Sequence, residues 1–294
     1  VCYYEMHEYK SCVVSLKEMV KLECYRVKGL EVLSTALWHL KRDKELCGLA
    51  QQVVEIDKFS PETWCVMGNC FSLQHEPETA IKFFERALQI DPNFTYAYSL
   101  CGHEYVSNED LEKAIVSFRH AIRCDERHYN AWYGLGAIYY RQEQLDLSEQ
   151  HFRQAMGINP LSSILKCYMS MVLHAQNSMT AANDANDEDS HGYSLNKELE
   201  AYHILYHASI ADPKNPQLHF QCVHILLSLD SYTSIQNEDT MDVQNGQDEV
   251  EVDDYLMRHP YLLKAIHALH VLEELVPKEP PIYSLLGQIY HEKL

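Results

Sequence analysis

Few residues in this chain have the types and the spacing that catalysis or metal binding requires. His203 and His207 lie four positions apart, so they would share one face of a helix and could hold one edge of a metal site. No third ligand follows at a fixed spacing, and a packing or surface role is the favoured interpretation. The run Gly134-Leu135-Gly136 begins like a dinucleotide-binding fingerprint, but it lacks the third glycine and lies within a helical pattern. We therefore predict that the chain is not an enzyme and that it binds no metal or cofactor.

These glycines belong to a pattern that recurs every thirty-four residues between positions 61 and 162. Each copy carries an aromatic residue, a glycine and a second aromatic residue, followed by a phenylalanine and an alanine. The equivalent residues are Trp64, Tyr98 and Trp132; Gly68, Gly102 and Gly136; Phe71, Tyr105 and Tyr139; Phe84, Phe118 and Phe152; and Ala87, Ala121 and Ala155. This pattern and this period are typical of the tetratricopeptide repeat, in which each copy is a pair of helices.

The spacing within each copy predicts the two helices directly. Two apolar stripes with helical spacing are separated by a polar connection: Trp64, Met67, Gly68 and Phe71, and then Ala80, Phe84 and Ala87. Ser60 and Pro61 suit the N-cap and first position of helix A, although they also match a proline-directed kinase site. Pro92 ends helix B, because proline disfavours helical geometry in the residue before it. We therefore predict an all-α fold, a right-handed α-solenoid superhelix of antiparallel helix pairs with a concave inner face.

The same register, applied to the whole sequence, predicts a single superhelix over residues 1–294. Its parts are a partial repeat at 1–26; repeats at 27–60, 61–94, 95–128 and 129–162; repeats with insertions at 163–215 and 216–279; and a half repeat at 280–294. The insertions, at about 177–196 and about 231–260, are polar and acidic, and we expect both to be disordered. The chain would begin and end inside a repeat of a longer protein, with its first helix as an exposed, frayed end.

Composition excludes several classes of partner. The net charge of −19 argues against nucleic acid, since phosphate binding needs clustered Lys and Arg. Roughly half of this charge lies in the two predicted insertions, so the solenoid itself is only mildly acidic. The sequence has no run of eighteen apolar residues, which argues against a membrane partner, and residues 1–10 show no signal-peptide pattern. Most of the ten cysteines take helix-face positions without paired spacing, and we interpret them as reduced core residues of a nuclear or cytoplasmic protein.

The predicted superhelix offers a binding groove. Its concave face should come mostly from helix A positions beside the apolar stripe, and these positions hold amide, imidazole, phenol and a few apolar groups. They are Glu62, Cys65, Asn69, Ser72 and Leu73; Tyr96, Ser99, His103, Val106 and Ser107; and Asn130, Tyr133, Ala137, Tyr140 and Arg141. Such a lining suits a short peptide that is read by hydrogen bonds and one anchor pocket. The alternative for each residue is that it simply packs or is solvated.

The exact residues of these repeats are more specific than the general tetratricopeptide pattern. The runs SPETWC (60–65), GNCFSLQ (68–74), AIKFFERALQIDPNF (80–94) and RHYNAWYGLG (127–136) closely resemble the third subunit of the anaphase-promoting complex, as do YRVKGLEVLSTALWHL (25–40) and VPKE (276–279). The resemblance implies a non-catalytic scaffold of this cell-cycle E3 ubiquitin ligase. It also implies a nuclear and cytoplasmic location, and contacts with other subunits of the complex. Homodimers in this family form through N-terminal repeats that this sequence lacks.

The resemblance further implies that the groove receives the carboxy-terminal Ile-Arg tails of co-activators and of a small processivity subunit. Carried onto this sequence, the tail site comprises Asn69, Leu73, His103, Glu104, Tyr133 and Tyr140. Glu104 is the nearest acid for the arginine head, and Asn69 and His103 are candidate donors for the terminal carboxylate.

Two other interpretations remain. One is a generic adaptor, such as a cochaperone that clamps acidic peptide tails. The groove offers mainly Asn, His and Tyr with a single Arg141, whereas an acidic-tail clamp needs several Lys and Arg, which weighs against this interpretation. The other is a purely structural spacer whose groove is filled by another subunit.

Overall fold

The computed structural model describes residues 2–183, 188–238 and 259–292. In these ranges every regular element is an α-helix, as the sequence predicts. The chain divides into two compact units, residues 1–162 and 163–294, and the division falls at a predicted repeat boundary. Each unit has its own hydrophobic clusters, and the single superhelix over residues 1–294 stays a prediction.

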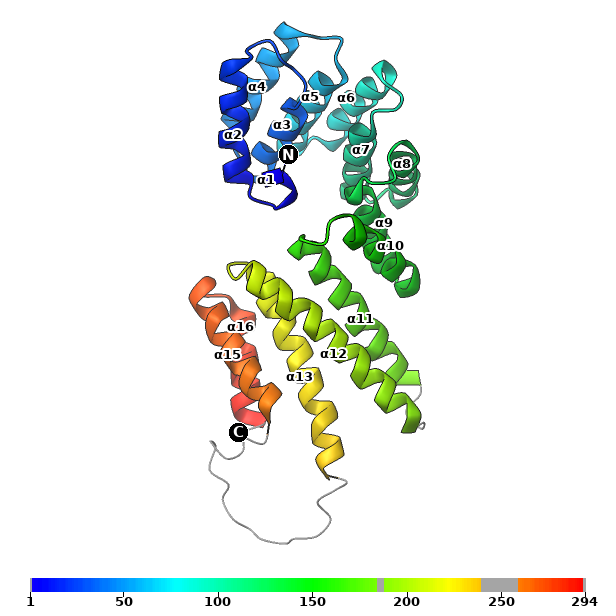
Figure 1. The fold of residues 1–294 in the computed structure, drawn as a ribbon, viewed down its shortest axis with the longest axis vertical. Helices are drawn as coiled ribbons and strands as arrows, with labels where there is room; N and C mark the ends of the chain where they lie inside the picture. Colours follow the sequence, from blue (N-terminus) through cyan, green and yellow to red (C-terminus); the bar gives the residue numbers. More distant parts are fainter. Residues whose placement is uncertain (1, 184–187, 239–258, 293–294) are drawn as a thin grey trace. The chain divides into compact units, whose positions relative to one another are not determined.

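The first unit consists of short helices in antiparallel pairs (Figure 1). They are α1 (Cys2–Glu5), α2 (Tyr9–Leu22), α3 (Leu30–His39), α4 (Asp43–Ile56), α5 (Pro61–Leu73), α6 (Pro77–Ile90), α7 (Thr95–Ser107), α8 (Leu111–Cys124), α9 (Tyr129–Arg141) and α10 (Leu145–Ile158). Helices α3, α5, α7 and α9 are the helix A members of the four predicted repeats, and α4, α6, α8 and α10 are the helix B members. The predicted helix pairs and their order are therefore confirmed in this unit.

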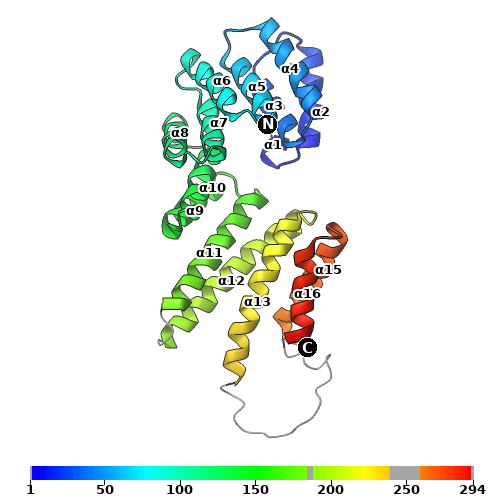
Figure 2. The same cartoon turned by 180° about the vertical axis from the view of Figure 1, so that it is seen from behind.

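The second unit contains longer helices, which are seen from the other side in Figure 2. They are α11 (Ser163–Asn183), α12 (Glu188–Ala211), α13 (Pro216–Glu238), α15 (Pro260–Leu275) and α16 (Pro280–Glu292). Helices α11, α12 and α13 have 21, 24 and 23 residues, compared with 13 in α5 and 14 in α6. No helix in the described ranges combines the length and the apolar character needed to cross a membrane.

The described residues within the two predicted insertions are mostly helical, although both insertions were expected to be disordered. Helices α11 and α12 continue through 177–183 and 188–196, and α13 continues to 238; residues 184–187 and 239–258 lie outside the described part of the chain. Buried polar contacts explain part of the extension. The carboxylate of Glu198 in α12 is fully buried and contacts His174 Nδ1 at 2.6 Å and Asn177 Nδ2 at 2.9 Å in α11. These contacts hold the far part of α11 against α12. Asp230, also fully buried, lies 3.1 Å from Nδ1 of His259.

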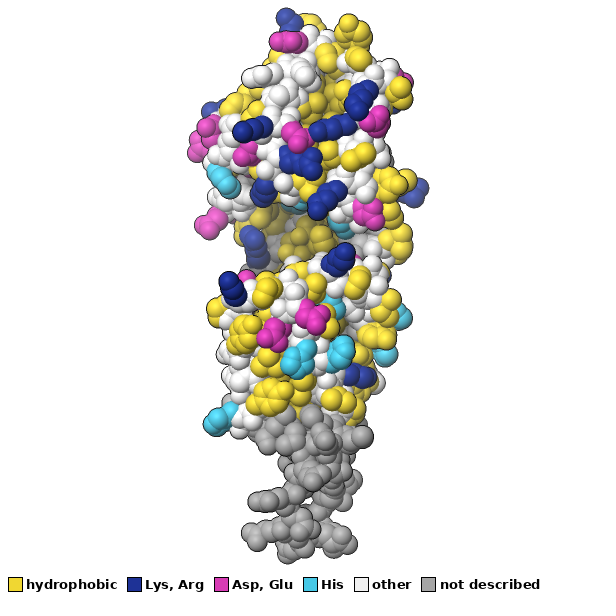
Figure 3. Space-filling view, turned by 90° about the vertical axis from the view of Figure 1, so that its left-hand side faces the viewer, with side chains coloured by type: hydrophobic (Ala, Val, Ile, Leu, Met, Phe, Trp, Pro, Cys, Tyr) yellow, Lys and Arg dark blue, Asp and Glu magenta, His cyan; other side chains and the backbone are white. Residues whose placement is uncertain are grey.

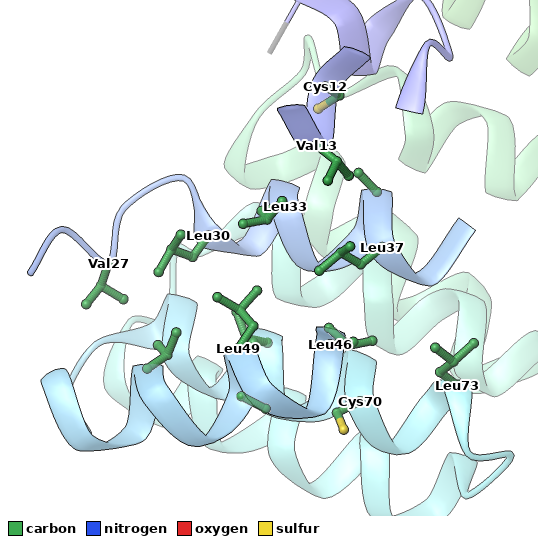
Figure 4. Packing of buried hydrophobic residues seen from close by; sticks show 14 of the residues in the cluster. Cys12, Val13, Val27, Leu30, Leu33, Leu37, Leu46, Leu49, Cys70 and Leu73 are labelled. Atoms are coloured by element: carbon green, nitrogen blue, oxygen red, sulfur yellow. The ribbon is translucent and has the colours of Figure 1, made fainter. Parts of the chain in front are cut away.

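The core of the first unit is organised by phenylalanines that lie on glycines. Phe84 of α6 packs on Gly68 of α5, and a Cβ added to Gly68 would lie only 2.2 Å from the ring. Phe118 of α8 lies in the same way against both Gly102 of α7 and Gly134 of α9. The repeat pattern thus places its smallest residues where the largest ones must fit. A separate apolar cluster joins α2, α3, α4 and α5, and Figure 4 shows Leu30, Leu33 and Leu37 of α3 facing Leu46 and Leu49 of α4.

The turn between the two helices of each pair has a feature that the sequence pattern does not reveal. One residue in each turn has a positive φ between 54° and 61°, and these residues recur every thirty-four positions: His7, Lys41, His75, Glu109 and Glu143. None of them is glycine, the residue that adopts this left-handed conformation at least cost. The first unit therefore repeats the same strained turn in each helix pair.

Candidate peptide-binding face

The helix A members of the first unit lie next to one another, with α3 against α5, α5 against α7, and α7 against α9. Side chains from these helices meet on what we call the helix A face, which is defined by Thr35, Trp38, Asn69, Ser72, Tyr96, His103, Glu104, His128 and Tyr133. The stacking of repeats puts residues about thirty-four positions apart side by side, so the contacts on this face connect consecutive repeats.

A relay of hydrogen bonds crosses three helices of this face. Trp38 Nε1 of α3 donates to Ser72 Oγ of α5 at 3.0 Å, and Ser72 Oγ donates in turn to Glu104 Oε1 of α7 at 2.5 Å. Burial raises the pKa of Glu104, and the hydrogen bond from Ser72 offsets part of this rise. In the described part of the chain, Glu104 forms no ion pair with a basic side chain. Glu104 is therefore a half-buried carboxylate that is oriented by the protein but not neutralised by it.

Two of the predicted site residues are less open than expected. Asn69 is 3% exposed, and its Nδ2 donates to Ser34 Oγ at 2.8 Å and to Thr35 Oγ1 at 2.9 Å. A peptide carboxylate could accept from Asn69 only if these bonds were broken. Leu73 is 8% exposed and belongs to the apolar cluster of α2 to α5, where Figure 4 shows it at the end of α5. Both residues face α3 and its neighbours because a helix A member packs on two sides, against its own helix B and against the preceding repeat.

The other predicted residues lie farther along the same face. The ring of His103 contacts Phe118 edge-on at 5.1 Å between centroids and lies 6.4 Å from Tyr133. Burial, together with the nearby His128 and His39, lowers the pKa of His103 to about 4. The imidazole is therefore neutral at physiological pH and can donate one hydrogen bond and accept another. Tyr140 is half-buried near the end of α9.

Sequence reasoning missed His128, the residue before α9. Its Nε2 atom is buried and has no hydrogen-bond partner in the described part of the chain. Burial also lowers the pKa of His128. Its ring lies 6.5 Å from that of Tyr96, whose hydroxyl is 2.5 Å from Thr35 Oγ1. A buried nitrogen without a partner is costly, so it marks a place where a ligand group could bind. The only sequence signal is that His128 lies within the run RHYNAWYGLG (127–136), just before the helix A member of that repeat.

The first residues of the chain pack against other parts of the first unit, contrary to the expectation of an exposed, frayed end. The ring of Tyr9 stacks on His39 with centroids 4.3 Å apart. His7 Nε2 lies 3.0 Å from Ser162 Oγ, and the backbone oxygen of Glu5 accepts from Asn159 Nδ2 at 3.3 Å. Within the first unit, residues 4–9 thus connect α3 to the chain after α10.

The described residues form neither a metal site nor, on the side shown in Figure 3, a basic surface for nucleic acid. His203 and His207 are both exposed on α12, and no group of three or more potential metal ligands occurs among the residues that the structure describes. Figure 3 shows one side of the molecule, on which basic and acidic side chains of the first unit are interspersed rather than gathered into one patch. This arrangement on that side offers no extended basic surface of the kind that nucleic-acid binding requires.

Comparison with known proteins agrees with the repeat pattern. Models described as tetratricopeptide repeat match residues 61–94 and 129–160, and one described as TPR repeat matches residues 102–143. A chain in the crystal structure of the APC/C hetero-tetramer Cut9–Hcn1 superposes with a TM-score of 0.54 and covers 95% of this chain and 52% of its own length. At 12% sequence identity this likeness shows a shared fold alone.

Curated relatives extend the match to nearly the whole chain. The chain is 38% identical over 291 residues to cell division cycle protein 27 homolog B of Arabidopsis thaliana, which covers 99% of this chain and 32% of the relative. It is 41% identical over 290 residues to anaphase-promoting complex subunit 3 of Dictyostelium discoideum, with 99% and 25% covered. The chain therefore spans about a third or less of the length of these relatives.

The matched models describe repeats and the relatives are homologues of cell division cycle protein 27 or anaphase-promoting complex subunit 3, which agrees with the prediction that the chain is not itself an enzyme. The chain contains tetratricopeptide repeats, and over nearly its whole length it is homologous to a part of proteins named cell division cycle protein 27 homolog or anaphase-promoting complex subunit 3.

Proposed function

We propose that the chain is part of a non-catalytic scaffold subunit of an anaphase-promoting complex, and that its helix A face binds carboxy-terminal Ile-Arg tails of co-activators and of a processivity subunit. The relatives support the scaffold role, since two of them carry the name of this subunit. The proposal includes other subunits of the complex as partners, and a nuclear and cytoplasmic location.

The state of Glu104 is the observation that carries the tail-binding proposal. Its carboxylate is half-buried, is held at 2.5 Å by Ser72, and lacks a basic partner among the described residues. An arginine guanidinium presents a planar fork of N–H donors that matches a carboxylate in two parallel hydrogen bonds. Such a pair would supply the positive charge that the protein itself does not provide. It would also compensate the burial that raises the pKa of Glu104.

The terminal carboxylate of the tail requires donors. His103 and His128 lie near enough to influence each other's charge, and both are neutral near pH 7 because burial lowers their pKa values. A neutral imidazole can donate from one nitrogen, and His128 has a buried Nε2 without a partner. We therefore assign the carboxylate to these two histidines rather than to Asn69. A two-residue tail would bind at about micromolar affinity, or about −8 kcal/mol, and attachment at several sites would add avidity.

Fluorescence anisotropy with a labelled peptide that ends in Ile-Arg and a free carboxylate tests this proposal. We expect binding by the native chain, with loss of about tenfold or more when the peptide is amidated, when its arginine is replaced by alanine, or in the variant Glu104→Gln. Glu112→Gln is the matched control, because Glu112 is an exposed acid on α8. Equal binding by Glu104→Gln and the native chain would remove Glu104 from the site. An unlabelled peptide with an acidic tail should not compete, and strong competition by it would favour the adaptor interpretation.

A further inference from the structure

Two cysteines on neighbouring helices form a close thiol pair. Cys47 lies on α4, the helix B of repeat 27–60, and Cys70 lies on α5, the helix A of the next repeat. Their Sγ atoms are 3.1 Å apart, and neither forms a disulfide. A disulfide bond is about 2.05 Å long, so the two sulfurs need to approach by only about 1 Å. Figure 4 shows Cys70 beside Leu46, the residue before Cys47, within the apolar cluster that joins the two helices.

The surroundings give the two thiols different properties. Cys47 is half-buried, whereas Cys70 is 7% exposed. Burial, together with the neighbouring Cys47, raises the pKa of Cys70 to about 12, so Cys70 keeps its proton at neutral pH. The side-chain amide of Gln74 donates to both sulfurs, at 3.5 Å to Cys47 and at 3.9 Å to Cys70. An oxidant from solution therefore meets Cys47 first.

The other cysteines do not share this arrangement. Cys24 and Cys124 are exposed and Cys65 is fully buried, and no other two thiols in the described part of the chain lie within hydrogen-bond distance of each other. The pair is therefore distinguished by proximity, by partial access and by a common hydrogen-bond donor. A single reactive cysteine would offer only partial access to solvent.

We propose that Cys47 and Cys70 are a redox modification site, at which a peroxide converts the two thiols into a disulfide that joins α4 to α5. Cys47 loses its proton to water, and the thiolate attacks hydrogen peroxide to give a sulfenic acid and hydroxide, which takes up a proton to form water. The sulfur of Cys70 then attacks the sulfenic sulfur while its proton passes to the leaving hydroxide, so the S–S bond forms as the S–O bond breaks and a second water leaves. Two thiols and one peroxide thus give one disulfide and two waters, with two electrons passing from sulfur to oxygen.

The bond would join two consecutive repeats covalently. Helix α4 is the partner of α3, while α5 carries Asn69 and Ser72, which hydrogen-bond to residues of α3. A disulfide at this place would restrict any separation of the two repeats. In a reducing compartment such bonds are transient and regulatory rather than structural. The proposal is independent of tail binding, because no peptide takes part in the oxidation.

Peptide mapping of the whole chain tests the proposal. The reduced chain is treated with a small excess of hydrogen peroxide, the remaining thiols are alkylated, and the tryptic peptides are measured by mass spectrometry. We expect a linked species made of peptide 45–58, which holds Cys47, and peptide 59–82, which holds Cys65 and Cys70, with fragmentation placing the bond on Cys70. The linked species should be lighter than the two free peptides by two hydrogen atoms.

Matched variants and a second readout complete the test. Cys47→Ser and Cys70→Ser should each abolish the linked species, whereas Cys124→Ser, which changes an exposed thiol on α8, should leave it unchanged. Oxidation should raise the Tm of the first unit by about 5–10 °C in the native chain and not in Cys47→Ser. The proposal fails if the folded chain gives no linked species, if Cys47 is joined to Cys65, or if the link forms only in denaturant.

Discussion

Ser72 and Glu104 are thirty-two positions apart in the sequence, yet the hydroxyl of one donates to the carboxylate of the other at 2.5 Å. The same hydroxyl accepts from Trp38, so a single serine connects three consecutive repeats. The contact orients a carboxylate on the helix A face without cancelling its charge. The same atoms thus connect the stacked repeats and orient the carboxylate of Glu104.

Removing this hydroxyl should affect both stability and binding. In Ser72→Ala the indole of Trp38 loses its acceptor and Glu104 loses its donor, and we expect the free energy of unfolding to fall by about 1–3 kcal/mol. Urea denaturation followed by circular dichroism measures the change. The control is Ser107→Ala, because the exposed Ser107 bonds only to a carbonyl of its own helix. Equal midpoints for the two variants would show that the relay contributes nothing to stability.

The close contact between Gly68 and Phe84 predicts that the stability of the first unit depends strongly on the size of the residue at position 68. A methyl group at position 68 would lie 2.2 Å from the ring, so Gly68→Ala should destabilise the first unit by about 1–3 kcal/mol. Gly48 is the matched control, since it also lies in a helix but has no atom within 4 Å of an added Cβ. Gly48→Ala should instead stabilise by about 0.5–1 kcal/mol. Thermal unfolding of both variants measures these changes. An unchanged free energy of unfolding in Gly68→Ala would contradict the close packing of Phe84 on Gly68.

The left-handed turn residues offer a stabilising change. Glu109 has a φ of 61°, a conformation that costs a residue with a side chain about 1–2 kcal/mol more than glycine. We expect Glu109→Gly to raise the free energy of unfolding by about 1 kcal/mol, as measured by urea denaturation. Lys82→Gly, in the exposed middle of α6, should lower it by about 0.5–1 kcal/mol. A loss of stability in both variants would argue against strain at position 109.

The histidines of the helix A face predict a dependence on pH. His103 has a pKa of about 4 in the folded chain and 6.5 when unperturbed, so between these values the unfolded chain binds more protons than the folded one. Stability therefore rises with pH across this window and is lost as the pH falls from about 6.5 to 4, by at most about 3 kcal/mol from this residue. In His103→Gln the loss on acidification should be smaller, as measured by Tm at several pH values. His203→Gln, at an exposed site, should retain the native pH profile.

The thirty-four-residue period was sufficient to predict the helices of the first unit, because the stripe residues recur at equivalent positions in the three copies between 61 and 162. It was not sufficient to predict which helix A positions are open. Trp64 and Phe71 were assigned to the buried stripe but are half-buried, whereas Cys65 and Asn69, assigned to the groove, are almost fully buried. A helix A member packs on two sides, and the second side depends on a neighbouring repeat that the periodicity of one helix does not describe.

Other features were hidden for different reasons. The partners of Asn69 are Ser34 and Thr35, in a repeat whose own pattern is weak, so no motif pointed to them. The left-handed turns contain no glycine and therefore gave no signal. Glu198 and Asp230 carried no signal in the sequence pattern, but each is fully buried beside a histidine. Polar composition alone led to the prediction of disorder, because it does not show that two long helices pair through their polar groups.

The ring of Phe118 lies against Gly102 of its own repeat and Gly134 of the next one, so it links pairing and stacking in a single contact. A shift of either helix by one position would bring a larger residue against the ring and break both contacts together. The contact therefore fixes the position of Phe118 relative to two helix A members at once. The helices of this unit that carry such glycine–phenylalanine contacts have 13 or 14 residues, whereas α11, α12 and α13 have 21, 24 and 23.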